Sequence, residues 1–168
     1  MEHTPSEKKV TRIERIRRMI EDHVEEPGLH SPHFVSHAPV DIATKRHHKG
    51  PEAVAELNLR SVFSGVQLNV IKAVESGNDV IVRWRLRGKW TGALPFAPKL
   101  KPNGAAVDFT GINVYHFSGD QVVSKTSEVD VPTFMGQAMA GGAINPQACE
   151  EAAITVSRPP DAFRMGEF

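Results

Sequence analysis

In the second half of the chain, apolar and polar residues alternate over four segments, and this pattern restricts the fold more than any other feature of the sequence. β-branched and aromatic side chains recur at every second position between turn-forming residues, which is typical of strands with two different faces. The connections at 76–79 and 118–121 are short and rich in Gly, Ser, Asn and Asp, so they predict antiparallel hairpins. The predicted strands are Val66–Glu75, Val80–Trp90, Ala106–Phe117 and Gln121–Val131.

The first sixty residues have helical periodicity instead. Apolar residues recur three or four positions apart over 10–24, which predicts an amphipathic helix. Thr4, Pro5 and Glu7 match the start of such a helix, with Thr4 as N-cap and Glu7 completing a capping box. A second helix is expected over 51–63, after a short segment and an irregular histidine-rich link. Helices followed by strands favour an α+β domain with the helices on one face of a sheet.

Composition excludes several classes of partner. Twenty basic and twenty acidic residues cancel, so we expect no binding to nucleic acid or to a membrane surface. The single cysteine, Cys149, excludes an intramolecular disulfide, and no signal peptide or membrane-spanning run is recognisable, so we expect a cytoplasmic protein. The length fits one domain over 1–137, followed by a partly flexible C-terminal extension over 138–168. The glycine-rich stretch 136–142 is interpreted as flexible tail.

Four stretches follow a recognisable order along the chain. They are Phe-Val-Ser-His at 34–37, Asn-Asp-Val-Ile-Val-Arg-Trp at 78–84 with Gly-Lys-Trp-Thr-Gly at 88–92, Phe-Thr-Gly-Ile-Asn-Val-Tyr-His-Phe at 109–117, and the strand that ends in Asp130. In this order they resemble the SnoaL-like polyketide cyclase and ester cyclase family, within the superfamily that includes nuclear transport factor 2 and ketosteroid isomerase. The resemblance spans about 12–137. It implies a cone-shaped α+β barrel, a curved antiparallel sheet with the N-terminal helices on its concave face.

Two motifs of the family are changed in this chain. Trp90 stands where family members commonly have a histidine, and Lys125-Thr126 replaces a His-Trp pair. Asp130 is retained and resembles the acid/base aspartate of the family's polyketide aldol cyclases. The resemblance therefore implies a reaction without cofactor on a small apolar organic substrate, with Asp130 as catalytic residue.

The register of the last hairpin decides which side chains share a face with Asp130. If Phe117 pairs with Val122, Asn113 lies opposite Thr126. The shared face, together with the apolar side of the neighbouring hairpin, should line the interior of the cone. On this register it contains Phe109, Gly111, Asn113, Tyr115, Ser124, Thr126, Glu128 and Asp130.

Two carboxylates would then stand side by side in the interior. Desolvation and mutual repulsion would raise the pKa of Asp130 or Glu128 toward the working pH, so that the pair could share a proton and act as general acid and base. The alternative is that both are solvated carboxylates at the end of a strand, with Asp130 capping the strand at the rim.

Seven further side chains are predicted to contact substrate. Asn113 and Tyr115 can hydrogen-bond a carbonyl or hydroxyl, but each can also satisfy its polar atoms within the core. Buried tryptophans more often belong to a plain core than contact a substrate. His37 matches a histidine that is frequent near the pocket mouth of the family. The predicted substrate-binding residues are Asn113, Trp90, His37, Tyr115, Trp84, Phe109 and Thr126.

No metal is expected, because the histidines at 30, 33, 37, 47 and 48 are not at i, i+4 spacing within a predicted helix and no cysteine is near them. We expect a cyclase or isomerase that closes an aldol ring, opens an epoxide or moves a double bond in a polyketide-like or terpenoid molecule. The alternative is a non-catalytic small-molecule-binding or assembly module on the same fold.

The resemblance also implies a homodimer. It would form through the outer face, which carries Arg83, Arg85, Arg87 and Lys89.

Overall fold

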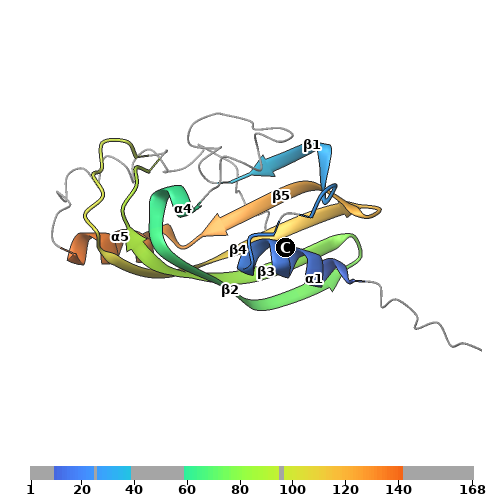
Figure 1. The fold of residues 1–168 in the computed structure, drawn as a ribbon, viewed down its shortest axis with the longest axis horizontal. Coiled ribbons are helices and arrows are strands. Elements are labelled where there is room, and N and C mark those ends of the chain that lie inside the picture. The colour runs from blue at the N-terminus through green and yellow to red at the C-terminus, as the bar shows by residue number, and fades with distance from the viewer. Residues whose placement is uncertain (1–9, 25, 39–58, 95–96, 142–168) are drawn as a thin grey trace, which may run out of the picture.

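The computed structural model describes residues 10–24, 26–38, 59–94 and 97–141 and has a mixed α+β fold (Figure 1). Within these residues, five strands form one curved sheet, and helices lie against it. The strands are β1 (His30–His37), β2 (Phe63–Ser76), β3 (Asp79–Trp90), β4 (Ala106–Ser118) and β5 (Gln121–Val129). The helices are α1 (Arg12–Glu21), α4 (Leu59–Val62) and α5 (Val131–Ala140).

The sheet confirms the four predicted strands. Its order is β1-β5-β4-β3-β2, and the pairs from β2 to β5 are antiparallel. Both predicted hairpins are present, with Gly77 and Gly119 in their turns at φ values of 59° and 61°, which glycine adopts without strain. Strand β2 begins at Phe63 and not at Val66, and the part of the second predicted helix that the structure describes is α4.

Strand β1 was not predicted by the alternating pattern. It pairs in parallel with β5, placing Ser36 beside Lys125. A parallel neighbour leaves no hairpin signal in the sequence, and Pro32 within the run weakens a strand assignment. The segment around 29–35 therefore forms a sheet edge.

Helix α1 begins later than predicted, and its N-cap is Thr11. The hydroxyl of Thr11 accepts a hydrogen bond from the backbone N–H of Glu14 at 3.2 Å, and the Glu14 carboxylate accepts one from the backbone N–H of Thr11 at 2.8 Å. This capping box satisfies both groups, and it lies seven residues after the one predicted at Thr4 and Glu7. Thr4 lies outside the described residues. The helix buries Ile16 against the sheet.

Helix α5 corrects the prediction of flexible tail over 136–140, and residue 142 lies outside the described residues. Asp130 is its N-cap and accepts a hydrogen bond from the backbone N–H of Thr133 at 3.1 Å. Phe134 and Ala138, one turn apart, are both buried. The predicted boundary between residues 137 and 138 falls within this helix, so the residues on both sides of it belong to one packed element.

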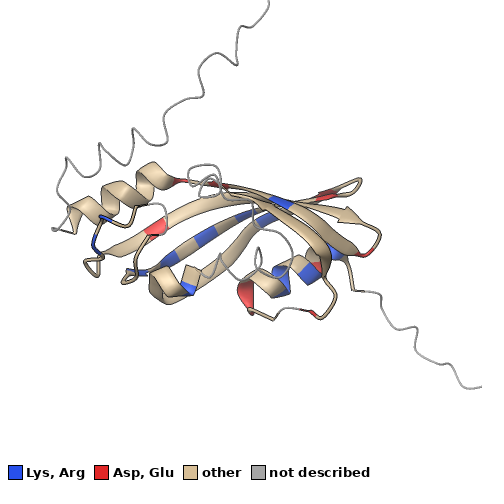
Figure 2. Cartoon of the chain, turned by 90° about the horizontal axis from the view of Figure 1, so that it is seen from above, with Lys and Arg blue, Asp and Glu red and all other residues tan. Residues whose placement is uncertain are grey.

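The buried apolar side chains of the sheet lie on one side, the inner face. Helices α1 and α4 both lie on this side (Figure 2). The buried side chains form two separate clusters. An aromatic cluster is centred on Trp84, Phe109 and Phe134, and a second cluster lies under α1 around Ile16 and Phe117. The boundary between the two clusters crosses the middle of the inner face.

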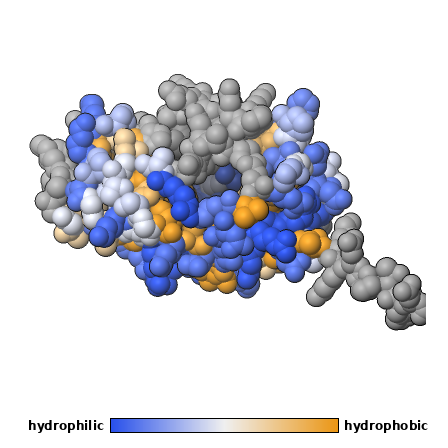
Figure 3. Space-filling view, viewed as in Figure 1, coloured by the Kyte–Doolittle hydropathy of each residue, from blue (hydrophilic) through white to orange (hydrophobic). Residues whose placement is uncertain are grey.

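The opposite, outer face carries charged residues and several exposed apolar ones. The basic residues of β3 follow one another along that strand (Figure 2). Figure 3 shows the other side of the molecule, on which α1 and α4 lie, and there the surface is mostly hydrophilic, with small groups of apolar side chains. No helix in the described ranges has the length and apolar composition needed to span a bilayer. The exposed large apolar residues of the outer face are Ile71, Val74, Ile81 and Ile112.

Candidate functional site

The register of the last hairpin differs from the predicted one by a single residue. Phe117 pairs with Val122 as expected, but His116 pairs with Ser124, so Val123 is an extra residue in β5. This β-bulge shifts every later pair, and Asn113 lies opposite Ser127 instead of Thr126. The predicted register is therefore wrong. A slip of one residue turns each β5 side chain to the other face of the sheet.

Three predicted site residues consequently lie away from the inner face. Glu128 is exposed and pairs with Ile112 on the outer face. Thr126 is also exposed there, and it pairs with His37 of β1, which is itself exposed. The two side chains expected to share a proton thus do not stand in an apolar interior.

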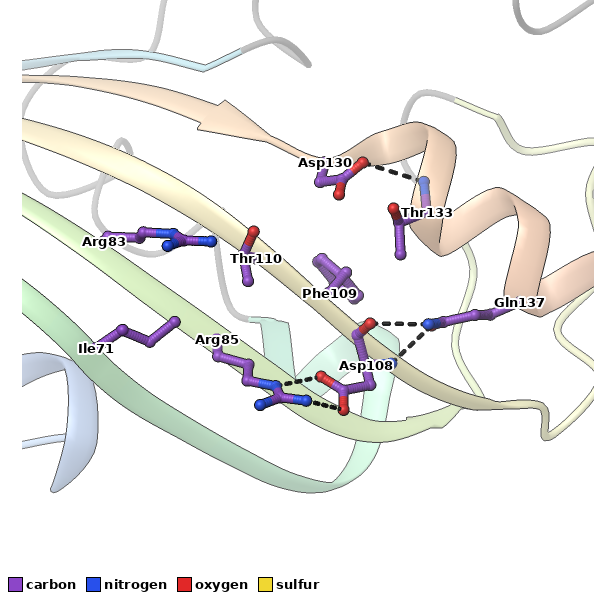
Figure 4. Close-up of a pocket in the computed structure, with 9 residues that line it drawn as sticks. All are labelled: Ile71, Arg83, Arg85, Asp108, Phe109, Thr110, Asp130, Thr133 and Gln137. Atoms are coloured by element: carbon purple, nitrogen blue, oxygen red, sulfur yellow. Dashed lines mark hydrogen bonds and ion pairs between the residues drawn. The ribbon is translucent and has the colours of Figure 1, made fainter.

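Asp130 lies at the end of an outer groove with a volume of about 440 Å³. Its pKa is lowered by the side-chain and backbone hydrogen bonds with Thr133, which is opposite to the direction expected for a buried acid/base pair. Figure 4 shows its carboxylate facing the start of α5, with Arg83 extending toward Thr110. The groove is lined by Ile71, Arg83, Arg85, Asp108, Phe109, Thr110, Asp130, Thr133 and Gln137.

The other acid of the groove is held by partners within the chain. Asp108 accepts hydrogen bonds from the guanidinium of Arg85 at 2.5 and 2.6 Å, and this bonding lowers the pKa of Asp108 and raises that of Arg85. Gln137 of α5 accepts from the backbone N–H of Asp108 and donates to its carbonyl, at 2.7 and 2.8 Å. These contacts fasten α5 to β4, which gives Asp108 a structural task (Figure 4).

Polar atoms also lie on the inner face, where the two apolar clusters meet. The indole N–H of Trp84 donates to the amide oxygen of Asn113 at 3.1 Å, and the amide nitrogen donates to the hydroxyl of Tyr115 at 2.9 Å. Trp84 and Tyr115 are buried, whereas Asn113 is half-buried. The structure therefore brings together three of the predicted substrate-binding residues.

The bulge adds residues to this row that the sequence did not reveal. Lys125 lies opposite Tyr115 and Ser127 lies opposite Asn113. Ser36 of β1 neighbours Lys125, and its hydroxyl is buried without a hydrogen-bond partner. The inner row is defined here as Ser36, Trp84, Asn113, Tyr115, Lys125 and Ser127. The sequence shows that Lys125 and Ser127 are polar, but it places them on the inner face only once the position of the bulge is known.

Trp90 and Phe109 belong to the aromatic cluster. Trp90 is 0% exposed, and its indole N–H donates to the carbonyl of Gly92 at 2.8 Å. Phe109 packs against Phe63 and Phe134, with ring centroids 5.6 and 5.5 Å apart. Both predicted contacts of substrate are thus engaged in core packing.

A metal site was also considered for this region. Among the described residues, no group of three His, Cys, Asp or Glu side chains is arranged to hold a metal ion. His47 and His48 lie outside those residues. Within the described part, the inner row is a set of hydrogen-bonding groups and one cation in an apolar wall.

Comparison with known proteins agrees with this architecture. A family model described as SnoaL-like polyketide cyclase matches residues 6–138. The chain belongs to the SnoaL-like polyketide cyclase family. No match was found among curated proteins.

Several solved structures share the fold of this family member. A protein of Jannaschia sp. CCS1 assigned as a SnoaL-like polyketide cyclase is 20% identical, with a TM-score of 0.62, over 76% of this chain and 91% of that one. A protein of Acidithiobacillus ferrooxidans assigned as a polyketide cyclase is 18% identical, with a TM-score of 0.60, over 77% and 93%. IdmH of Streptomyces antibioticus, also assigned as a polyketide cyclase, is 18% identical, with a TM-score of 0.56, over 74% and 94%. At these identities the likeness establishes a common fold.

The single tyrosine of the chain permits a direct measurement of the inner row. Burial raises the pKa of Tyr115 from 10.0 to about 12, although the hydrogen bond from Asn113 acts in the opposite direction. A titration of phenolate absorbance should therefore have its midpoint near pH 12. Because the folded pKa exceeds the unfolded one, about 2–3 kcal/mol of stability is fully present below pH 10 and is lost as the pH rises through 12.

Tyr115→Phe is the control for this titration, because it removes the titrating group. Both proteins lose stability in alkali as lysines deprotonate, so the comparison is the difference between their free energies of unfolding from pH 10 to 12. The difference between the two free energies of unfolding should become smaller over this range, because only the parent loses the stability that comes from the raised pKa of Tyr115. A phenolate midpoint near 10 would show instead that the hydroxyl is open to water.

Proposed function

We propose that this protein is a cofactor-independent cyclase or isomerase of a polyketide-like or terpenoid molecule, and that the inner row is its site. Membership of the SnoaL-like family supports the reaction class. The observation that carries the choice of site is the chain of hydrogen bonds in which Asn113 joins Trp84 of one apolar cluster to Tyr115 of the other. An apolar wall with a few convergent polar groups is the usual composition of a small-molecule site.

The chemistry of the inner row suits negative charge that develops on oxygen. Aldol closure, epoxide opening and double-bond isomerisation all pass through an alkoxide or enolate oxygen. The hydroxyl of Tyr115 and the ammonium of Lys125 lie on the same face and can stabilise such an oxygen by hydrogen bonding and charge. Preorganised donors of this kind act without reorganisation during the reaction, which is why they lower its barrier.

Asp130 and Glu128 as acid and base remain the competing prediction. In the described strands β1, β3, β4 and β5, no carboxylate points to the inner face. Asp130 and Tyr115 lie on opposite sides of the sheet, so one small substrate cannot contact both in this arrangement. Variants of the two residues therefore decide which face holds the reaction.

The absence of an inner carboxylate on β1, β3, β4 and β5 also favours a second candidate function. A wall that offers donors and a cation, but no base, can hold a ligand without transforming it. A non-catalytic binding module is therefore the alternative, and turnover distinguishes it from the enzyme.

Turnover can be tested with a metabolite extract of the organism that encodes the chain. We expect the protein to convert one component into a product of the same mass, or of that mass less water, as followed by chromatography and mass spectrometry. Conversion should persist after treatment with a chelator. Tyr115→Phe should lower the rate by about 10²–10³-fold, because it removes a donor to the developing oxyanion.

Asp130→Asn and Glu128→Gln are the matched variants on the outer face. Both should keep the rate within about threefold of the parent rate, a change too small for loss of a positioned acid or base. A loss of about 10²–10⁴-fold in Asp130→Asn, with Tyr115→Phe unaffected, would move the reaction to the outer groove and restore the carboxylate mechanism. Consumption of no component by the parent protein supports the binding module.

We also propose a homodimer through the outer face, on the basis of its charge pattern. Arg83, Ile112 and Glu128 form one row across β3, β4 and β5, and Ile112 is 43% exposed. Neither Arg83 nor Glu128 has an ion-pair partner among the described residues. A two-fold axis along β4 would set Arg83 of each copy against Glu128 of the other and bring the two Ile112 side chains together, as an isologous interface requires.

Charge reversal tests this arrangement. Arg83→Glu and Glu128→Arg should each weaken the dimer at micromolar concentration, because each sets like charges face to face. The double variant should recover association, since its row is again complementary. Sedimentation velocity measures the outcome. A parent species of 18.5 kDa would reject the dimer, and a double variant that stays dissociated would reject this pairing.

A further inference from the structure

The direction of each hydrogen bond in the inner row follows from the chemistry of its members. An indole N–H can only donate, so the Asn113 atom 3.1 Å from Trp84 must be the amide oxygen. The amide nitrogen then faces Tyr115, and the hydroxyl oxygen accepts from it at 2.9 Å. The hydrogen of the phenol must therefore point away from Asn113. No side chain or carbonyl in the described part of the chain accepts it.

The backbone prevents this arrangement from reversing. A Cβ at Gly111 would lie 2.2 Å from Cζ2 of Trp84, so the indole occupies space that only glycine leaves free. The indole is held against β4, with its N–H beside Asn113. With this donor in place, a flip of the Asn113 amide would set two donors against each other.

We propose that the Tyr115 hydroxyl is the hydrogen-bond donor to a ketone or enolate oxygen of the ligand, so that the site selects ligands with an acceptor at this point. The inference rests on the proposed function and names the ligand class of the same site. A hydroxyl can both accept and donate, and a ligand oxygen would supply the acceptor that the Tyr115 hydrogen does not find among the described residues.

The surroundings of Tyr115 define the rest of the ligand. Lys125 lies opposite it on the same face, and a cation there favours an oxygen that carries negative charge, as an enolate does. The buried hydroxyl of Ser36 lies next to Lys125 in the register of β1 and β5 and is a second polar contact. The neighbouring clusters are apolar, and Asn113 is the half-buried member of the Trp84–Asn113–Tyr115 chain of hydrogen bonds. The matching ligand is an apolar ring system with one acceptor oxygen.

Two probes of equal shape isolate this hydrogen bond. 2-Acetylnaphthalene carries a carbonyl oxygen, and 2-isopropenylnaphthalene carries a CH₂ group in its place. Their dissociation constants can be measured by quenching of tryptophan fluorescence. Each variant is compared with the parent by the ratio of the two constants, so that the different hydration of the probes cancels.

In Tyr115→Phe, the ratio should shift toward the hydrocarbon by about tenfold, the usual effect of losing one hydrogen bond to a buried donor. Asn113→Asp should give a similar shift with the tyrosine still present, because the new carboxylate accepts from both Trp84 and Tyr115 and takes the phenol hydrogen from the ligand. Asp130→Asn, in the outer groove, should leave the ratio unchanged. The infrared carbonyl frequency of the bound ketone should be lower in the parent than in Tyr115→Phe.

The outcomes separate this inference from the function on which it rests. If both probes bind the parent and the ratio and carbonyl frequency are the same in Tyr115→Phe, the apolar site stands and the donor role is rejected. If neither probe binds the parent, the apolar site itself is rejected, together with the proposed function. A shift in Tyr115→Phe that is absent in Asn113→Asp would reject the direction assigned to the hydrogen bonds.

Discussion

One extra residue in β5 determines which side chains of the last hairpin face the interior. With Val123 bulged, Lys125 and Ser127 turn toward α1 and the aromatic cluster, and Glu128 turns to the outer face. Without the bulge, the same sequence would place Glu128 in the interior and Lys125 in solvent. This local change of register determines the composition of the inner row. It also determines which carboxylates are exposed and how charge is arranged on the outer face.

The inner row also shows how the fold tolerates polar groups within an apolar wall. Trp84 and Asn113 satisfy each other, and Asn113 satisfies the lone pair of Tyr115, so the cost of burying these groups is largely offset. Among the described residues, the hydroxyl of Ser36 has no hydrogen-bond partner and the hydrogen of Tyr115 has no acceptor. Residual polarity of this kind at the boundary of two apolar clusters is what a ligand site requires and a plain core avoids.

Most of the sheet could be predicted from the sequence, because its signals are local. Alternation located β2 to β5, and the turns at Gly77 and Gly119 showed how they pair. The bulge at Val123 could not be predicted, since the residue is an ordinary β-former and carries no turn signal. The predicted site was accordingly right in bringing Asn113 and Tyr115 together. It was wrong in setting Asn113 opposite Thr126 on the face that holds Asp130.

The parallel pairing of β1 could not be predicted for a related reason. Its partner is distant in the sequence, so the segment itself carries no local signal of the pairing. Ser36 could therefore not be placed beside Lys125 from the sequence. The capping box at Thr11 and Glu14 was readable, but an equally good signal at Thr4 competed with it. Local sequence signals thus predict where the helices and strands lie, whereas the register between distant strands determines which side chains form the site.

A crystal structure of the protein with bound 2-acetylnaphthalene tests the central claim most directly. The account predicts the ketone on the inner face, with its oxygen about 2.7 Å from the Tyr115 hydroxyl and its rings against the apolar clusters. A ketone bound in the outer groove, against Asp130 and Thr133, would contradict it, as would a ketone on the inner face whose oxygen points away from Tyr115.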